Sequence, residues 1–246
     1  HIRVYSINAI LSGITYSTNL WVGNYQKLKS NNDLLTFEDF AQLSTGIKRI
    51  GVLRADIDSL SLAFATAYSK EEKLSTLSRY AMLSSSLTEF FRNHINAIVR
   101  REAGCEHFFL SAPRADAGNV SIVYSGGDDL FIVGAWDEVL ELGVDIYREF
   151  RKYTQGKLTL SAGFGMFGKS YPVQQMALQT GALEDEAKLN AEKTKDSVAL
   201  FGMIQSDATD PRFAQDVRHV YKWGEFIDGV CAEKLQLLQN SFTLEE

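Results

Sequence analysis

A short acidic turn between two apolar runs most constrains what this chain can fold into. Residues 125–129 have the sequence Ser-Gly-Gly-Asp-Asp and stand between apolar runs at 122–124 and 130–133. Two apolar runs joined by a glycine-rich turn of this length indicate a β-hairpin. The two glycines can adopt positive φ and, having no side chains, let a phosphate approach the backbone closely. The sequence therefore predicts a hairpin whose end carries two carboxylates, Asp128 and Asp129.

A second pair of acids follows an apolar run near residue 50. Asp56 and Asp58 are two positions apart, so both lie on one face of the predicted strand. After this strand, apolar residues recur every three or four positions over 77–98, which indicates a long amphipathic helix. A further helix capped by Asp137, a strand over 158–164, a helix that begins at Pro172 and a strand over 198–201 complete the predicted elements.

The order of these elements predicts where the acids meet. Residues 49–202 follow the order β-α-β-β-α-β and then one more helix and strand, which is typical of a ferredoxin-like sheet. In such a sheet the first and third strands are neighbours, and the hairpin turns at the end where the first strand finishes. Four carboxylates would then repel one another unless cations compensate them, so we expect two Mg²⁺ or Mn²⁺ ions. The predicted metal ligands are Asp56, Asp58, Asp128 and Asp129.

Two metal ions shared by aspartates are suited to nucleotidyl transfer. They polarise an α-phosphate, activate a hydroxyl and stabilise the leaving pyrophosphate. We predict that Asp128 and Asp129 are catalytic, and that lysines near the end of the last helix contact a triphosphate. A solvated helix end explains those lysines equally well. The predicted nucleotide-binding residues are Ser125, Gly126, Gly127, Lys188, Lys193 and Lys195.

Composition limits the class of protein. The chain has 246 residues and 45% hydrophobic content, enough for a sizeable core, and its net charge of −6 argues against coating nucleic acid by charge alone. It lacks an apolar run long enough to span a membrane, and Cys105 and Cys231 form neither a Cys-x-x-Cys pair nor a disulfide framework. We expect a soluble, cytoplasmic protein without membrane contact. Because it begins with His1, we expect a piece of a longer protein.

Four stretches together carry a family resemblance. They are Gly-Val-Leu-Arg-Ala-Asp-Ile-Asp-Ser-Leu at 51–60, Tyr-Ser-Gly-Gly-Asp-Asp-Leu-Phe at 124–131, Leu-Ser-Ala-Gly-Phe at 160–164 and Glu-Asp-Glu-Ala-Lys at 184–188. In combination they resemble the second palm, or cyclase-like, domain of the large subunit of type III-A CRISPR effector complexes. The resemblance covers about residues 15–202, and the remaining tail resembles the start of that subunit's C-terminal helical domain.

The resemblance implies an α+β ferredoxin-like palm with an antiparallel sheet and a C-terminal helical segment. It implies that ATP is converted to cyclic oligoadenylates when target RNA is bound. The implied partners are the other subunits of a CRISPR ribonucleoprotein, guide RNA, target RNA and the first palm domain of the same subunit. The family's HD nuclease domain would lie outside this segment.

The resemblance also divides the chain. Residues 1–48 would be a connector from a preceding domain, 49–202 the palm, and 203–246 the start of the helical domain. Within the connector, Thr36 and Asp39 have the spacing of a helix N-cap. The tail carries large apolar residues and no evident strand partner, so we expect another surface to cover it. Packing back on the palm is one possibility, and the resemblance implies instead a helical domain that touches the small subunits of the complex. Those apolar residues are Trp223, Phe226, Ile227, Val230, Leu235 and Leu238.

Two other functions stay open. A diguanylate-cyclase-like enzyme would share the palm and a similar turn, but here Leu130 separates the acids from Phe131, and Ala117 and Val120 replace an Arg-x-x-Asp inhibitory motif. A catalytically silent palm could instead act as a scaffold that binds subunits and RNA. Four retained acids argue against the scaffold, because buried carboxylates without a task destabilise a fold.

Overall fold

A computed structural model of the chain describes residues 3–13, 17–66, 76–102, 104–110, 113, 116, 118–189, 195–201, 219–235, 237–238 and 240. Among these residues, none of the helices has both the length and the apolar character needed to span a bilayer. The strands are β1 (Val4–Ile7), β2 (Ser17–Leu20), β3 (Ile50–Ile57), β4 (Val120–Gly126), β5 (Asp129–Ala135), β6 (Leu160–Phe167), β7 (Ser197–Leu200) and β8 (Val220–Lys222). The helices are α1 (Phe37–Leu43), α2 (Leu60–Thr66), α3 (Leu77–Glu89), η2 (Phe90–His94), α4 (Ile95–Val99), α5 (Trp136–Tyr153), α6 (Val173–Lys188) and η3 (Glu225–Leu235).

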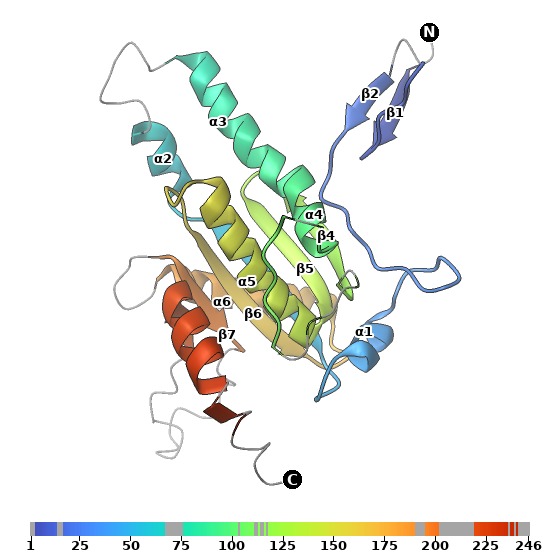
Figure 1. The fold of residues 1–246 in the computed structure, drawn as a ribbon, viewed down its shortest axis with the longest axis vertical. Helices are drawn as coiled ribbons and strands as arrows, with labels where there is room; N and C mark the ends of the chain where they lie inside the picture. The colour runs from blue at the N-terminus through green and yellow to red at the C-terminus, as the bar shows by residue number, and fades with distance from the viewer. Residues whose placement is uncertain are drawn as a thin grey trace.

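A six-stranded sheet in the order β4-β5-β3-β6-β7-β8 forms the centre of the molecule (Figure 1). Strand β3 lies between β5 and β6 and is antiparallel to both. The first and third strands of the predicted ferredoxin-like order are therefore neighbours, and the α+β palm is confirmed. The sheet is mixed, because β6 and β7 run parallel while its other pairs are antiparallel. The predicted antiparallel sheet is thus confirmed for most strand pairs, with one parallel pair at β6 and β7.

Alternate residues of β3 face two different layers. Leu53, Ala55 and Ile57 belong to the large core formed with η2, α4 and α5. Ile50 and Val52 belong to a smaller core with residues of α1 and α6. Figure 1 shows α5 in front of the sheet and α6 behind it. Because strand side chains alternate between faces, polar residues at even positions of β3 lie on the α6 face.

Two helices differ from their sequence-based predictions. The helix expected over 77–98 is interrupted by the π-helical turn η2, which changes the direction of the side chains that follow it. Helix α5 begins at Trp136, and its N-cap is Ala135 without a side-chain hydrogen bond. Asp137 therefore does not cap the helix, although its charge in the first turn suits the helix dipole.

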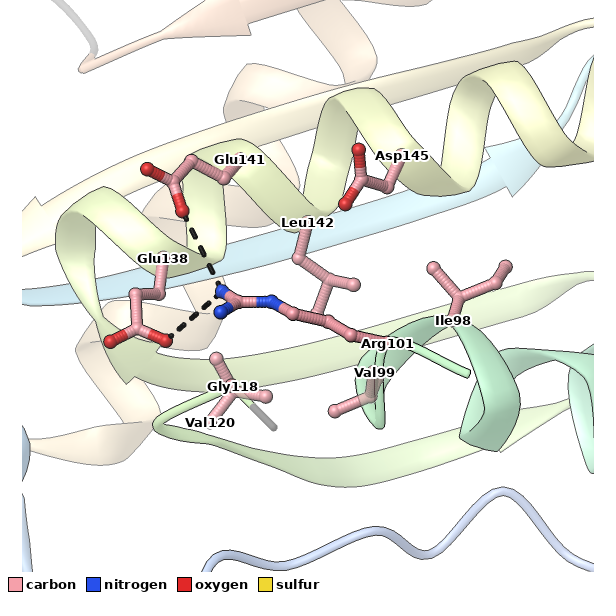
Figure 2. A pocket seen from close by; sticks show the side chains of 9 residues that line it. All are labelled: Ile98, Val99, Arg101, Gly118, Val120, Glu138, Glu141, Leu142 and Asp145. Atoms are coloured by element: carbon pink, nitrogen blue, oxygen red, sulfur yellow. Dashed lines mark ion pairs between the residues drawn. The ribbon is translucent and has the colours of Figure 1, made fainter. Parts of the chain in front are cut away.

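A column of buried acids on α5 holds the segment that follows α4. The backbone amides of Glu106, Phe108 and Leu110 donate to the carboxylates of Glu149, Asp145 and Glu141, at 3.1, 2.6 and 2.8 Å. Amides two residues apart in this segment thus match carboxylates four residues apart on the helix. At the end of this column the Arg101 guanidinium lies 3.5 Å from Glu138 and 3.8 Å from Glu141 (Figure 2).

The described part of the tail packs on the palm itself. Strand β8 pairs antiparallel with β7, and Trp223 and Phe226 are buried in the large core. The Trp223 ring stacks on Tyr147, with centroids 4.8 Å apart, and its Nε1 donates to the Leu160 carbonyl at 3.0 Å. Of the two possibilities, the described residues show packing on the palm, and the expectation that Trp223 and Phe226 contact the small subunits is wrong. A strand of only three residues gives no periodic signal, so the sequence did not reveal it.

The N-terminal residues run along the open edge of β4. The amide of Ile122 donates to the Tyr25 carbonyl at 2.8 Å, and the amide of Lys27 donates to the Val120 carbonyl at 3.2 Å. Farther out, β1 and β2 form a separate parallel pair, seen apart from the main sheet in Figure 1. The Thr36 capping box predicted for α1 is confirmed. The three domain boundaries stay predictions.

Candidate functional site

The acidic hairpin brings two of the predicted aspartates face to face. Asp56 on β3 is the cross-strand partner of Asp129 on β5. Directly opposed residues share a face of the sheet, so both carboxylates lie on the α6 face. Gly126 pairs with Asp129, and Gly127 and Asp128 form a two-residue turn in which Gly127 has φ of +68°. That conformation strains side-chain-bearing residues, which accounts for glycine at this position.

Asp129 carries the unusual electrostatics of the site. Burial raises the pKa of its carboxyl group, Arg54 opposes that shift, and the nearby Asp56 charge adds to it. Its Oδ1 atom is buried and has no hydrogen-bond partner. Burying a carboxylate oxygen without a hydrogen-bond donor costs folding free energy unless a cation binds that oxygen. This atom is the observation that fits a metal ion at the hairpin.

Two basic residues partly neutralise the acids. The Lys188 ammonium lies 2.7 Å from Asp56 Oδ2 and 2.6 Å from Glu184 Oε1. Burial alone would lower the pKa of Lys188, but the two carboxylates outweigh it and raise that pKa. On the same face, Arg54 Nε lies 3.3 Å from Glu184 Oε2. The site is therefore a charge network of three acids and two bases.

Asp58 has surroundings different from those of Asp56. Its carboxylate accepts hydrogen bonds from the Thr159 hydroxyl at 2.6 Å, the Ser161 hydroxyl at 2.7 Å and the Asp196 amide at 2.9 Å. Asp58 is also buried. Both of its oxygens are thus occupied by protein donors, and they join the end of β3 to the beginnings of β6 and β7. This arrangement is that of a structural acceptor.

The predicted nucleotide-binding residues lie in several different places. Ser125 donates its hydroxyl to the Phe91 carbonyl on the α5 face, so it points away from the acids. Lys188 lies within the site, whereas Lys193 is outside the described residues. Lys195 lines a pocket with Asp58, Ser59 and Lys157. Gly126 and Gly127 lie beside the acid pair, where the Gly126 carbonyl accepts from the Tyr124 hydroxyl and a Cβ atom at Gly127 would have no neighbour within 4 Å.

Sequence reasoning missed Arg54 and Glu184. Each carried a signal, because Arg54 stands two positions before Asp56 on the same strand face, and Glu184 stands four positions before Lys188 on one helix. Glu184 is buried, and burial raises the pKa of its carboxyl group although Lys188 donates to it. Their contact across β3 and α6 could not be seen from either element alone.

A mixed sheet with an acid at the end of its central strand and a glycine-acid hairpin beside it defines a palm-type domain. The family model described as "Cas10/Cmr2, second palm domain" matches residues 49–199. The chain belongs to this family, as the second palm domain of a Cas10/Csm1 large subunit of type III-A CRISPR systems.

Relatives of known name agree with this assignment. The chain is 37% identical over 246 residues to the CRISPR system single-strand-specific deoxyribonuclease Cas10/Csm1 (subtype III-A) of Mycobacterium tuberculosis, covering 99% of this chain and 27% of the relative. It is 36% identical to the protein of the same name from Streptococcus thermophilus, with 99% and 28% coverage. The chain thus spans about a quarter of the length of the curated relatives it matches.

Solved structures share the fold over most of the chain. A Csm1-Csm4 cassette in complex with cA4 has a TM-score of 0.74 at 28% identity and covers 90% of this chain and 30% of that one. The cassette in complex with one ATP has a TM-score of 0.75 at 29% identity, with the same coverage. The Csm1 structure from T. onnurineus has a TM-score of 0.75 at 29% identity and covers 92% of this chain and 31% of that one.

Proposed function

We propose that this palm is a metal-dependent nucleotidyltransferase that converts ATP to cyclic oligoadenylates within a type III-A CRISPR effector complex. The observation that carries the proposal is the cross-strand pair of Asp56 and Asp129, with one buried carboxylate oxygen lacking a donor, beside the open turn at Gly127. Support comes from related cassettes solved with ATP, AMPPNP, cA3 and cA4.

Asp56, Asp128 and Asp129 would hold two Mg²⁺ or Mn²⁺ ions, which are hard cations that prefer carboxylate oxygens. When bound, such ions polarise the α-phosphate of ATP and lower the pKa of the attacking hydroxyl. We assign Asp58 a structural role, because its oxygens already accept three protein hydrogen bonds. It orients the end of β3, from which Asp56 projects.

Lys188 has two tasks in this proposal. While it bridges Asp56 and Glu184, its ammonium offsets part of the negative charge of the site. With Asp56 engaged as a metal ligand, the Lys188 ammonium would be released from that carboxylate and could contact the triphosphate as a point charge. Glu184 and Arg54 position Lys188, because Glu184 Oε1 binds the Lys188 ammonium while Arg54 binds Glu184 Oε2.

The remaining charges suggest where the triphosphate lies. Lys157 and Lys195 line one pocket with Ser59 and Thr159 next to the end of β3. Phosphate oxygens in this pocket would meet two basic side chains and the Ser59 hydroxyl, since the Thr159 hydroxyl already donates to Asp58. The Gly126 and Gly127 backbone would lie along the other side of the nucleotide. Lys193 stays a candidate for the same group.

We further propose that the palm works in an assembly. A related Csm1 is solved with Csm4 in a type III-A CRISPR-Csm interference complex. The proposed partners are a subunit of that kind, the guide and target RNA bound by the complex, and a first palm domain that supplies the other half of the nucleotide site. With a net charge of −6, this chain would leave most RNA contacts to its partners.

The test is a substrate screen on the complete effector complex. Labelled ATP or GTP is supplied with Mg²⁺ or Mn²⁺, with and without matching target RNA, and the products are separated by chromatography. Cyclic oligoadenylates that depend on ATP, metal and target RNA are expected. Products from GTP would favour the diguanylate-cyclase-like alternative, and no nucleotide product would favour a silent scaffold. Either result would overturn the proposal.

A further inference from the structure

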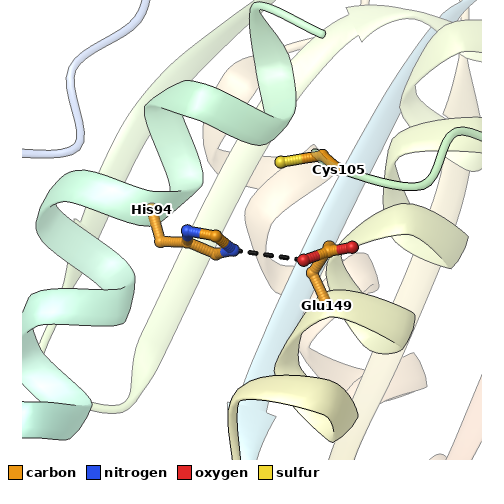
Figure 3. Close-up of side chains that lie close together, drawn as sticks. All are labelled: His94, Cys105 and Glu149. Carbon is orange, nitrogen blue, oxygen red and sulfur yellow. Dashed lines mark hydrogen bonds and ion pairs between the residues drawn. The ribbon is translucent and has the colours of Figure 1, made fainter. Parts of the chain in front are cut away.

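We propose that His94, Cys105 and Glu149 form a zinc site on the face of the sheet opposite the acidic hairpin. One potential ligand atom from each side chain lies within 4.8 Å of the other two (Figure 3). The three residues come from η2, from the segment held along α5, and from α5 itself. Zinc would thus link α5 to η2 and to the segment that follows α4, more than 40 residues earlier in the sequence.

The donor set selects the metal. An imidazole nitrogen, a thiolate sulfur and a carboxylate oxygen together suit Zn²⁺, whereas Mg²⁺ and Mn²⁺ prefer oxygen ligands alone. Zinc bonds of about 2.0–2.1 Å in a tetrahedron place neighbouring nitrogen and oxygen ligands about 3.3 Å apart. His94 Nε2 and Glu149 Oε2 are 3.2 Å apart. These two ligands already have the separation that a tetrahedral zinc ion requires.

Neighbouring groups hold these ligands in place. Glu149 is buried, and its other oxygen, Oε1, accepts from the Glu106 amide at 3.1 Å. The His94 ring lies beside Phe90 and Tyr153, with centroids 5.3 and 6.0 Å away. Partners that fix the orientation of a ligand raise metal affinity. Glu149 can therefore keep its backbone hydrogen bond through Oε1 while Oε2 binds zinc.

The site is open to solvent on one side. The His94 side chain is 35% exposed and Cys105 is partly exposed, so an ion can enter without unfolding the domain. Binding would release the Cys105 thiol proton to solvent, because the thiolate is the ligand. Three protein ligands leave a fourth position for water. The consequence is a metal link between the two helices of this face and the segment between them.

Cobalt titration of the full chain tests the proposal. Co²⁺ replaces Zn²⁺ in such sites and gives a sulfur-to-cobalt charge-transfer band in the near ultraviolet only when a thiolate binds it. We expect this band in the unmodified chain and its displacement by one equivalent of Zn²⁺. Cys105→Ser should abolish the band, and Cys231→Ser, which alters the only other cysteine, should leave it unchanged.

Two further variants separate this site from the acidic hairpin. Loss of a residue that only hydrogen-bonds to a metal ligand lowers metal affinity by about 10–100-fold. His94→Gln removes a ligand itself, so it should lower the zinc affinity by more than that. Asp129→Asn should leave zinc binding unchanged, because Asp129 belongs to the α6 face. Circular dichroism in chelator checks that each variant is folded. The proposal fails if the folded chain shows no charge-transfer band, or if Cys105→Ser binds zinc as the unmodified chain does.

Discussion

Asp56 and Asp58 show how much the surroundings of a single residue decide. They are two positions apart, yet Asp56 faces Lys188 and Asp129, whereas Asp58 accepts three hydrogen bonds from β6 and the start of β7. A carboxylate paired with an ammonium group can exchange that partner for a metal ion. A carboxylate saturated by fixed donors mainly joins strands together. The two residues should therefore respond differently to substitution.

The first prediction concerns the acid pair. Asp129→Asn, Asp56→Asn and the double substitution Asp128→Ala with Asp129→Ala should each reduce metal-dependent ATP polymerisation by at least about 100-fold, or about 3 kcal/mol. The melting temperature of Asp129→Asn should stay the same or rise, because the Asp129 carboxylate is partly desolvated. Rates are measured in the complete complex. Unaltered turnover in the double variant would disprove the catalytic assignment.

The second prediction concerns Asp58. Asp58→Ala leaves two hydroxyls and one amide without their acceptor, so the free energy of unfolding should fall by about 3 kcal/mol. Urea denaturation of the full chain measures this loss. Asp228→Ala, which removes an exposed carboxylate, is the matched control and should change stability by less than about 0.5 kcal/mol. Equal stability of the two variants would contradict the structural role.

At the scale of elements, α5 and the segment beside it form one unit. The amides of Glu106, Phe108 and Leu110 are bound by acids along one stripe of the helix. The imidazole Nδ1 of His107 lies 3.2 Å from Asp145 Oδ2. Hydrogen-bond donors stabilise these buried carboxylates, but the charged form has lost the hydration that it has in the unfolded chain. The stability of this unit should consequently depend on pH.

The third prediction gives the sign of that dependence. Burial raises the pKa of Asp145 from 3.8 to about 6, although the Phe108 amide and His107 oppose it. The folded state then holds this proton more tightly, so the group's contribution to stability falls as pH rises from about 4 to about 6. Relative to the unmodified chain, Asp145→Asn should gain up to about 3 kcal/mol across that range.

Denaturation at several pH values measures this difference, and His107→Gln separates the contribution of the imidazole. A difference between Asp145→Asn and the unmodified chain that is independent of pH would show that Asp145 titrates normally.

The features that the sequence predicted correctly depend either on neighbouring residues or on the order of the elements along the chain. The hairpin, the neighbouring first and third strands and the Thr36 cap follow from turn chemistry and element order. The partners of Asp58 and the cluster around Cys105 come from several segments with no shared period, so no linear pattern reveals them. The π-helical turn η2 was not predicted either. It adds one residue to a turn of the helix, which barely changes the spacing of the apolar residues.

At the scale of the whole molecule, the two faces of the sheet have separate tasks. The α6 face carries the acid pair and its charge network, while the α5 face carries the large core and the proposed zinc ligands. The tail completes the large core, because Trp223 and Phe226 pack within it. A chain cut before β8 would therefore lose part of its palm.

The fourth prediction tests the tail. Trp223→Ala should lower the free energy of unfolding by about 3–5 kcal/mol, because it empties a buried site and removes the hydrogen bond to Leu160. Leu238→Ala, at an exposed apolar position of the same tail, should cost less than about 0.5 kcal/mol. Thermal unfolding of the full chain compares the two. A small shift for Trp223→Ala combined with failed assembly would restore the expectation of an external surface.

The central position of β3 also affects how the chain is made. Its partners β5 and β6 begin about 70 and about 100 residues later in the sequence. A ribosome adds about 5–20 residues per second, so about 5–20 s pass before β6 is made and β3 can form its full set of backbone hydrogen bonds. Until β5 is made, both edges of β3 are open to wrong pairing, and the edge that later pairs with β6 stays open longer. The strand that unites the site is thus the part of the newborn chain most in need of protection from aggregation.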